Sequence, residues 1–157
     1  MSTRNMQEDM TMNMKVIGSL KMIGYWTTTI IVTLELLVGG VTDLIHGREL
    51  LFVGDPVVLV LAHLGYPLYL LSILGVWRLL GAIALLVPRF PRLKEWAYAG
   101  EFFAMTGAAA SGVVRGKDDP GTLIWPPLIL AVLTLISWVL RPQSRILGVL
   151  FPTQKLA

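Results

Sequence analysis

The chain has 157 residues, of which 55% are hydrophobic and 15% charged, and its formal net charge is +3. This composition excludes an ordinary soluble domain and a disordered chain. The sequence contains no cysteine, which excludes disulfides, thiol catalysis and iron–sulfur ligation by this chain. A redox role would therefore need a bound cofactor or a partner subunit.

The first 21 residues are polar and rich in methionine. We expect residues 1–21 to form a disordered tail, because chain ends without apolar anchors are poorly ordered. Met1, Met14 and Met22 are alternative starts of the protein. No signal peptide is predicted, since the first apolar run is long and lacks a small-residue exit.

Four apolar stretches follow, each about as long as a bilayer crossing, which takes about 20 residues. Only helices and closed barrels satisfy their backbone hydrogen bonds in lipid, and these stretches are too long and continuous for barrel strands. The sequence therefore predicts an all-α integral membrane four-helix bundle over residues 22–141 and a cytoplasmic tail over 142–157. The predicted spans are 22–45, 68–87, 96–114 and 123–140.

The connections between the spans are punctuated by proline and glycine. Asp55-Pro56 indicates the start of a helix, and Val57–Leu64 is too short to cross a bilayer, which favours an interfacial or re-entrant helix. Gly65-Tyr66-Pro67 ends it. The connection Pro88–Arg92 is short and stiff, so the second and third spans are predicted to be antiparallel neighbours. Pro126-Pro127 falls in the first turns of the last span, where proline is tolerated.

Cationic residues are distributed unequally between the two ends of the predicted spans. Nine lie on one side: Arg4, Lys15, Lys21, Arg89, Arg92, Lys94, Arg141, Arg145 and Lys155. Three lie on the other: Arg48, Arg115 and Lys117. The positive-inside rule then predicts that both termini of this multi-pass protein are cytoplasmic. This distribution also explains the net positive charge better than nucleic-acid binding does.

Three ionisable residues fall inside predicted spans: Glu35, Arg78 and Glu101. Charge at membrane depth is costly, so these residues should face the bundle interior and pair. At 1.5 Å per residue, Glu35 and Arg78 both lie about 15 Å into their spans, whereas Glu101 lies about 10 Å beyond Lys94. Glu35 is therefore the better predicted partner of Arg78, although the reach of arginine keeps Glu101 open.

Helical spacing places further polar residues on the same face of the first span as Glu35, and we call this row of residues the polar seam. Thr28, Glu35, Thr42 and His46 share one face with Gly39, and Asp43 either joins this seam or caps the exit of the span. Two interpretations stay open. The charges form a structural ion pair between helices, or they form a proton-linked or ligand-binding site.

No catalytic motif was identified, so catalytic residues are unknown and enzymatic activity is left undecided. The two histidines, His46 and His63, have no fixed pattern of carboxylates around them, and we predict no metal site. The sequence also lacks a phosphate loop, a nucleophile triad and a haem or zinc motif.

Three short sequence runs are more specific indicators of a protein family than the hydropathy pattern. They are Leu64-Gly65-Tyr66-Pro67, then Leu74-Gly75-Val76-Trp77-Arg78-Leu79-Leu80-Gly81-Ala82, then Pro88-Arg89-Phe90-Pro91-Arg92-Leu93-Lys94-Glu95-Trp96-Ala97-Tyr98-Ala99-Gly100. In order and spacing this region, about a third of the chain, resembles the DoxX-like family of small bacterial membrane proteins. The resemblance implies a four-helix bundle in the bacterial cytoplasmic (inner) membrane, with a basic intramembrane residue at Arg78.

The chain departs from the family pattern at three positions. Members often have Phe where this chain has Glu101, Asp near Ala104 and His near Gly112. A role built on that Asp and His does not transfer here, and Glu101 is a candidate replacement for the acidic position.

The family is named after a subunit associated with a quinol oxidase and with thiosulfate–quinone oxidoreduction. The resemblance thus implies an accessory or quinone- or lipid-associated component of a membrane redox assembly, with quinone as the candidate cofactor and a redox subunit as the candidate partner. The alternatives are a non-catalytic scaffold or assembly factor and a small proton-coupled transporter. Arg78 argues against the last, because a neighbouring guanidinium would hold Glu35 ionised and disfavour cationic cargo. The oligomeric state is left open.

Overall fold

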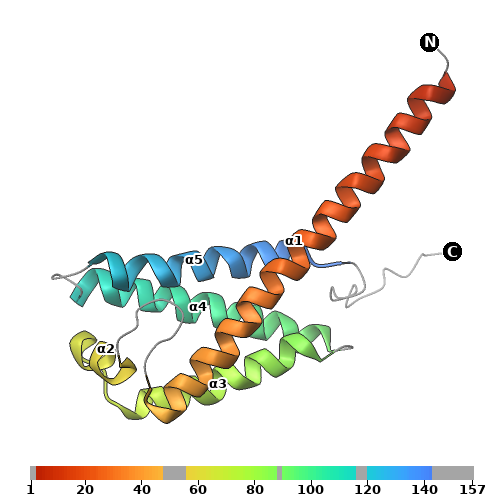
Figure 1. Ribbon diagram of the computed structural model, residues 1–157. Helices are drawn as coiled ribbons and strands as arrows, with labels where there is room; N and C mark the ends of the chain where they lie inside the picture. Colours follow the sequence, from red (N-terminus) through yellow and green to blue (C-terminus); the bar gives the residue numbers. More distant parts are fainter. Residues whose placement is uncertain (1–2, 48–55, 88–89, 116–119, 143–157) are drawn as a thin grey trace, which may run out of the picture.

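The computed structural model describes residues 3–47, 56–87, 90–115 and 120–142, which form five helices and no β-strand (Figure 1). The helices are α1 (Thr3–Ile45), α2 (Val57–Leu64), α3 (Tyr69–Leu86), α4 (Pro91–Arg115) and α5 (Pro120–Val139). The all-α class predicted from the sequence is thereby confirmed. Asp55, the connection at 88–89 and residues 143–157 of the predicted tail lie outside the described residues.

Each long helix contains one of the four apolar stretches, and proline and glycine mark several helix ends. Pro56 caps the N-terminus of α2, and Gly65, with a φ of 80°, ends this helix in the left-handed conformation that glycine adopts without steric cost. Pro91 begins α4. Pro126 and Pro127 lie inside α5 and not in its first turn as expected, because α5 already begins at Pro120.

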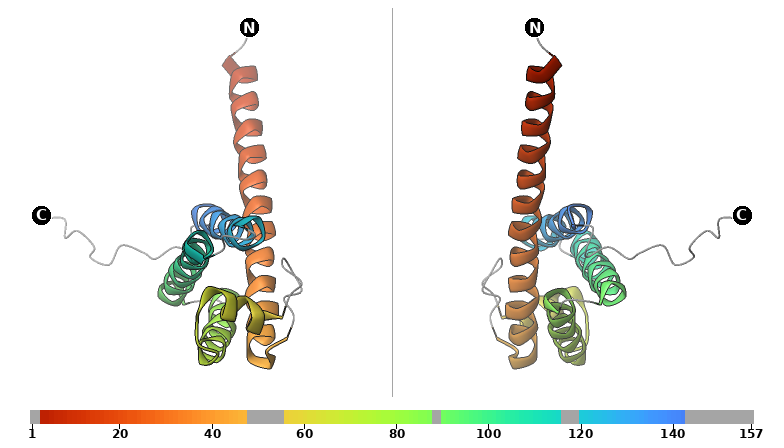
Figure 2. Two further views of the ribbon diagram at one scale, coloured as in Figure 1. Left: turned by 90° about the vertical axis from the view of Figure 1, so that its left-hand side faces the viewer. Right: turned by 90° about the vertical axis from the view of Figure 1, so that its right-hand side faces the viewer.

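One expectation is wrong for the described part of the N-terminal segment. From Thr3 onward this segment is not a disordered tail but the first part of α1, which runs without a break to Ile45. Met, Gln, Glu and Lys are good helix formers, and no proline interrupts them, so the helix nucleated in the bundle extends outward. This extension is exposed and projects away from the other helices (Figures 1 and 2).

The four long helices pack in a ring. α1 contacts α3 and α5, and α4 contacts α5 and α3, so that each helix has two neighbours. α3 and α4, which the short connection predicted to be neighbours, are in contact. The short helix α2 lies at one end of the ring and packs against α4 (Figure 2).

The bundle has apolar side chains both outside and inside. Its outer surface carries large ones, among them Trp77, Phe103 and Trp125, each about two-thirds exposed. The interior contains an apolar core, which includes Val32 and Leu36, and with it a set of buried polar and charged side chains: Thr28, Thr29, Thr33, Glu35, Thr42, Asp43, Lys94, Glu101, Thr134, Ser137 and Arg141. An apolar exterior combined with charges turned inward is typical of a lipid environment.

Length and composition identify two helices of the described residues as able to cross a bilayer. They lie at Gln7–Ile45 and Tyr69–Leu86, and Leu123–Val139 forms a shorter apolar helix. α4 carries charges along its length, including the buried Glu101. Four crossings and cytoplasmic termini therefore stay predictions.

Two glycines let α1 and α3 approach closely. A Cβ on Gly75 would lie 2.8 Å from the backbone oxygen of Gly40, and a Cβ on Gly40 would lie 3.1 Å from that of Gly75. Only glycine allows this separation, as in other close crossings of membrane helices. The contact fixes the register of the two helices that carry the buried charges.

Candidate functional site

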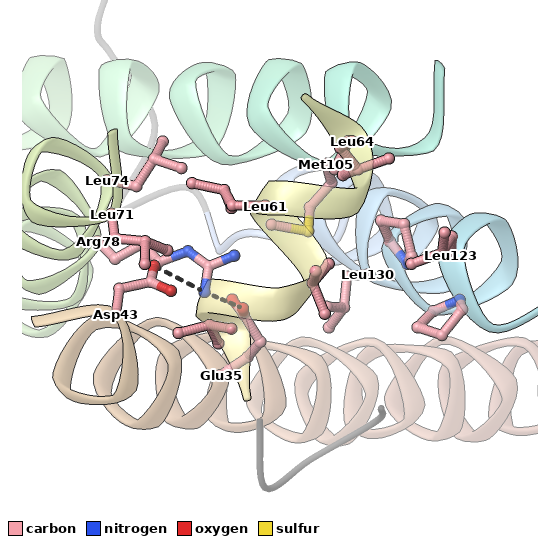
Figure 3. A pocket seen from close by; sticks show the side chains of 15 residues that line it. Glu35, Asp43, Leu61, Leu64, Leu71, Leu74, Arg78, Met105, Leu123 and Leu130 are labelled. Atoms are coloured by element: carbon pink, nitrogen blue, oxygen red, sulfur yellow. Dashed lines mark ion pairs between the residues drawn. The ribbon is translucent and has the colours of Figure 1, made fainter. Parts of the chain in front are cut away.

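A partly buried arginine of α3 lies between two buried carboxylates of α1. Nη1 of Arg78 is 3.4 Å from Oε1 of Glu35 and 3.4 Å from Oδ2 of Asp43 (Figure 3). The side chains of Glu35 and Asp43 are 6% and 7% exposed, and that of Arg78 is 18% exposed. The structure thus brings together Glu35 and Arg78, the predicted pair, and adds Asp43 as a second acidic partner.

Gly39 provides the space for this arrangement. It lies one helical turn from Glu35 and one from Asp43, on the same face of α1. A Cβ at Gly39 would overlap Nη1 of Arg78 and would lie 3.1 Å from Oε1 of Glu35. The sequence Glu35-x₃-Gly39-x₃-Asp43 therefore forms a notch on α1 that fits one guanidinium.

Glu101 of α4 is the third acid of this region. Its side chain is buried, with the residue 5% exposed, and it interacts with Glu35 through the charges and a side-chain hydrogen bond, and with Arg78 through its charge. No ion pair between Glu101 and Arg78 is found in the described residues, in keeping with the expectation that Glu35 is the better partner of Arg78.

A cavity of about 180 Å³ adjoins the ion pairs. Glu35, Asp43 and Arg78 lie in its wall, and the remaining lining residues are apolar and come from the other helices as well (Figure 3). They are Val57, Val60, Leu61, Leu64, Leu71, Leu74, Met105, Ala108, Leu123, Pro126, Pro127 and Leu130. The sequence did not reveal this wall, because α2 and α5 contribute to it only through the tertiary fold.

The other members of the predicted seam do not join the ion pairs. Thr28 is buried and donates to the carbonyl of Gly24 at 2.8 Å within its own helix. Thr42 is buried but does not line the cavity. His46 is exposed just beyond the end of α1, with a φ of 53°. The seam predicted from helical spacing is therefore discontinuous.

Lys94 has a structural role that the sequence analysis missed. It was counted among the residues that set orientation, yet it is 2% exposed. Its Nζ donates to the carbonyls of Ala84, at 3.0 Å, and Leu85. These carbonyls belong to the last turn of α3, where backbone acceptors lack helical partners and a cation is favourable. Lys94 of α4 is thus the C-terminal cap of α3.

Arg141 is the second cation whose role differs from the prediction. It follows α5, is 7% exposed, and its Nη2 is 2.6 Å from Oε1 of Glu95. The indole of Trp138 donates to the other oxygen of Glu95 at 2.7 Å. The guanidinium also lies over the ring of Tyr98, 5.3 Å from its centroid. These contacts join the start of α4 to the end of α5.

The electrostatics of Glu95 follow from these partners. Partial burial by itself would raise the pKa of Glu95, but the hydrogen bonds from Trp138 and Arg141 and the positive charge of Arg141 outweigh it and hold the pKa below 4.5. Glu95 is therefore ionised at neutral pH and pairs with Arg141. The run Lys94-Glu95-Trp96-Ala97-Tyr98 is thus largely explained by helix–helix contacts.

The arrangement can hold a molecule that is mostly apolar and has one polar end. The described residues contain no group of three or more His, Asp or Glu side chains placed to hold a metal ion. An apolar cavity of roughly 150 Å³ is known to accommodate benzene, so a volume of 180 Å³ accommodates one ring. Arg78 and the carboxyl groups offer hydrogen-bond partners to such a ring at its polar end.

Comparison with known proteins gives one match. A model of the DoxX-like family matches residues 27–137, which include the second part of α1, the whole of α3 and α4, most of α5 and every residue of the cavity wall. No curated protein and no solved structure matches the chain.

Proposed function

The chain belongs to the DoxX-like family, and from this premise we propose that it is an accessory, quinone- or lipid-associated component of a membrane redox assembly. In this proposal the ring of a quinone, or a lipid of similar shape, enters the cavity beside Arg78. The protein would lie in the bacterial cytoplasmic membrane with four crossings and both termini inside, in contact with lipid and with a redox subunit.

One observation carries the proposal: an apolar cavity of about 180 Å³ has its only charged groups, among its lining residues, at Arg78, Glu35 and Asp43. A quinone combines a single apolar ring with carbonyl oxygens that accept hydrogen bonds. The guanidinium of Arg78 lines the cavity and carries several N–H donors, which suit such an oxygen. The prenyl tail would extend between helices into lipid, because the outer surface is apolar.

The chain itself supplies binding and orientation in this proposal, and not electron transfer. It has no cysteine to carry redox equivalents. The electron carriers would therefore belong to the partner subunit, and this chain would hold the quinone ring within the lipid phase.

Native mass spectrometry of the protein, extracted gently from its own membrane, tests the proposal. We expect a stoichiometric quinone or lipid that is retained by the wild type and lost on Ala108→Phe, because Ala108 lines the cavity and a phenyl group would fill it. Ala110→Phe is the matched control, since Ala110 lies on an exposed part of the same helix and does not line the cavity.

Two results would contradict this function. One is a wild-type protein that carries only bulk lipid and no redox subunit. The other is a bound molecule that survives Ala108→Phe as well as it survives Ala110→Phe. Either result favours the alternative of a non-catalytic scaffold or assembly factor, in which Arg78, Glu35 and Asp43 only hold α1 and α3 together.

A further inference from the structure

Two buried carboxyl groups share a side-chain hydrogen bond although neither is a donor when ionised. The carboxyl groups of Glu35 and Glu101 interact in this way between α1 and α4. Glu35 is 4% and Glu101 is 5% exposed. Oε2 of Glu35 and Oε1 of Glu101 accept no hydrogen bond from any donor in the described residues. A hydrogen bond between two carboxyl groups requires a proton on one of them.

The like charges of the two acids lead to the same requirement. Glu35 and Glu101 are both buried and interact, so they would repel each other if both were ionised. An ionised group in a dry interior is very unfavourable, and a buried group becomes neutral instead. One proton on this pair of acids removes the repulsion between them.

The ion pairs indicate which acids share the proton. Glu35 and Asp43 each have an oxygen 3.4 Å from Nη1 of Arg78, whereas no ion pair joins Glu101 to a cation of the described residues. Protonation of Glu101 therefore breaks no ion pair and gives its carboxyl group the donor that the neighbouring carboxylate of Glu35 can accept.

We propose that Glu35 and Glu101 form a proton-binding site, in which one proton is held between the two carboxyl groups at the wall of the cavity. The groups that face it are Asp43 on α1 and Arg78 on α3. The cavity residues contributed by α2 and α5 are all apolar. Because Glu35 itself lines the cavity, the proton lies where a molecule in the cavity can exchange it.

The site also bears on whether a cationic ligand is disfavoured. From the sequence, Arg78 neutralises Glu35 and disfavours a cationic ligand. In the structure Arg78 lies between two carboxylates, and Glu101 is a further acid that interacts with Glu35. The inference does not depend on which molecule fills the cavity, so it can fail or hold independently of the proposed quinone association.

Infrared spectroscopy of the full-length protein, in micelles of a detergent without ester or carboxyl groups, tests the site, since the ester carbonyls of phospholipids would absorb in the same region. A protonated carboxylic acid has a carbonyl stretch separate from the bands of carboxylates, and this band shifts in D₂O. We expect the wild type to show this band near neutral pH and Glu101→Gln to lose it. Glu95→Gln is the matched control on the same helix. The band should persist in this variant, because Glu95 is ionised and pairs with Arg141.

The carbonyl band in the wild type and the variants decides whether the proton-binding site exists. A band present in the wild type, lost in Glu101→Gln and kept in Glu95→Gln supports the site. Absence of the band from the wild type at neutral pH overturns it, and this measurement needs no variant to fold. A band that is unchanged in Glu101→Gln, or lost equally in Glu95→Gln, also overturns it. Glu101→Asp should retain the band at a shifted frequency, because the carboxyl group remains but is displaced.

Discussion

Removal of Arg78 should destabilise the bundle more than removal of the whole group of charges. In Arg78→Gln the carboxylates of Glu35 and Asp43 lose the guanidinium that lies 3.4 Å from each, and both stay buried. Breaking a buried pair by removing one partner costs about 3–5 kcal/mol. Arg78 is 18% exposed, so the lower part of that range, about 3 kcal/mol, is expected for the free energy of unfolding.

The triple variant Glu35→Gln, Asp43→Asn, Arg78→Gln has similar side-chain volumes and no charge at these three positions. We expect it to be within about 1 kcal/mol of the wild type, because replacing a complete buried ion pair is often neutral. Arg92→Gln, at an exposed position near the start of α4, is the control for loss of a cation.

Unfolding in mixed micelles, followed by tryptophan fluorescence, measures these differences. The expected order of stability is wild type and Arg92→Gln, then the triple variant, then Arg78→Gln. Equal stability of Arg78→Gln and the triple variant would refute the reasoning, since the penalty is attributed to carboxylates left without their cation. Stability of Arg78→Gln equal to that of the wild type would refute it as well.

Three further variants test neighbouring features. Gly39→Ala should lower the free energy of unfolding by about 1–3 kcal/mol, because the added methyl group displaces the guanidinium of Arg78. Gly100→Ala is the control and should not be destabilising, because nothing lies within 4 Å of the added Cβ. The same micelle assay compares the two variants. Lys94→Met should cost about 1–3 kcal/mol, because it leaves backbone acceptors at the end of α3 without their donor, and an unchanged denaturation midpoint would show that water replaces the ammonium group. For Glu95, the folded-state pKa is below 4.5, so its stabilising effect is present above pH 4.5 and is lost as the pH falls through the lower folded value. The difference in melting temperature between wild type and Glu95→Gln should therefore shrink on acidification below pH 4.5, and a difference that grows would contradict the pairing of Glu95 with Arg141.

Much of the fold could be predicted because hydropathy and helix-breaking residues are local signals. The apolar runs, Pro56, Gly65 and Pro91 located the helices to within a few residues, apart from the N-terminal part of α1. That error arose because polarity was read as disorder, although polar residues such as Gln and Lys propagate a helix well.

The candidate site was predictable only in part. The pairing of Glu35 with Arg78 followed from the cost of charge at membrane depth, and Asp43 was already an open member of the seam. The apolar wall from α2 and α5 and the contact of Glu101 with Glu35 depend on how the helices incline, which no local pattern encodes. The contacts of Lys94 and Arg141 were missed for a related reason: a cation near a span end can set orientation, cap a helix or do both, and only the tertiary fold reveals the contacts.

The crossing at Gly40 and Gly75 has a mechanical consequence. Because the backbones of α1 and α3 are separated there by no side chain, neither helix can rotate or slide far without collision, and the two behave as one rigid body. Glu35, Asp43 and Arg78 all belong to that body. A change in cavity volume that keeps the ion pairs intact must therefore come from displacement of α2, α4 or α5 against it. The charged wall of the cavity, together with Leu71 and Leu74 of α3, is stationary, and the apolar residues from α2, α4 and α5 are the part that can adjust to an occupant.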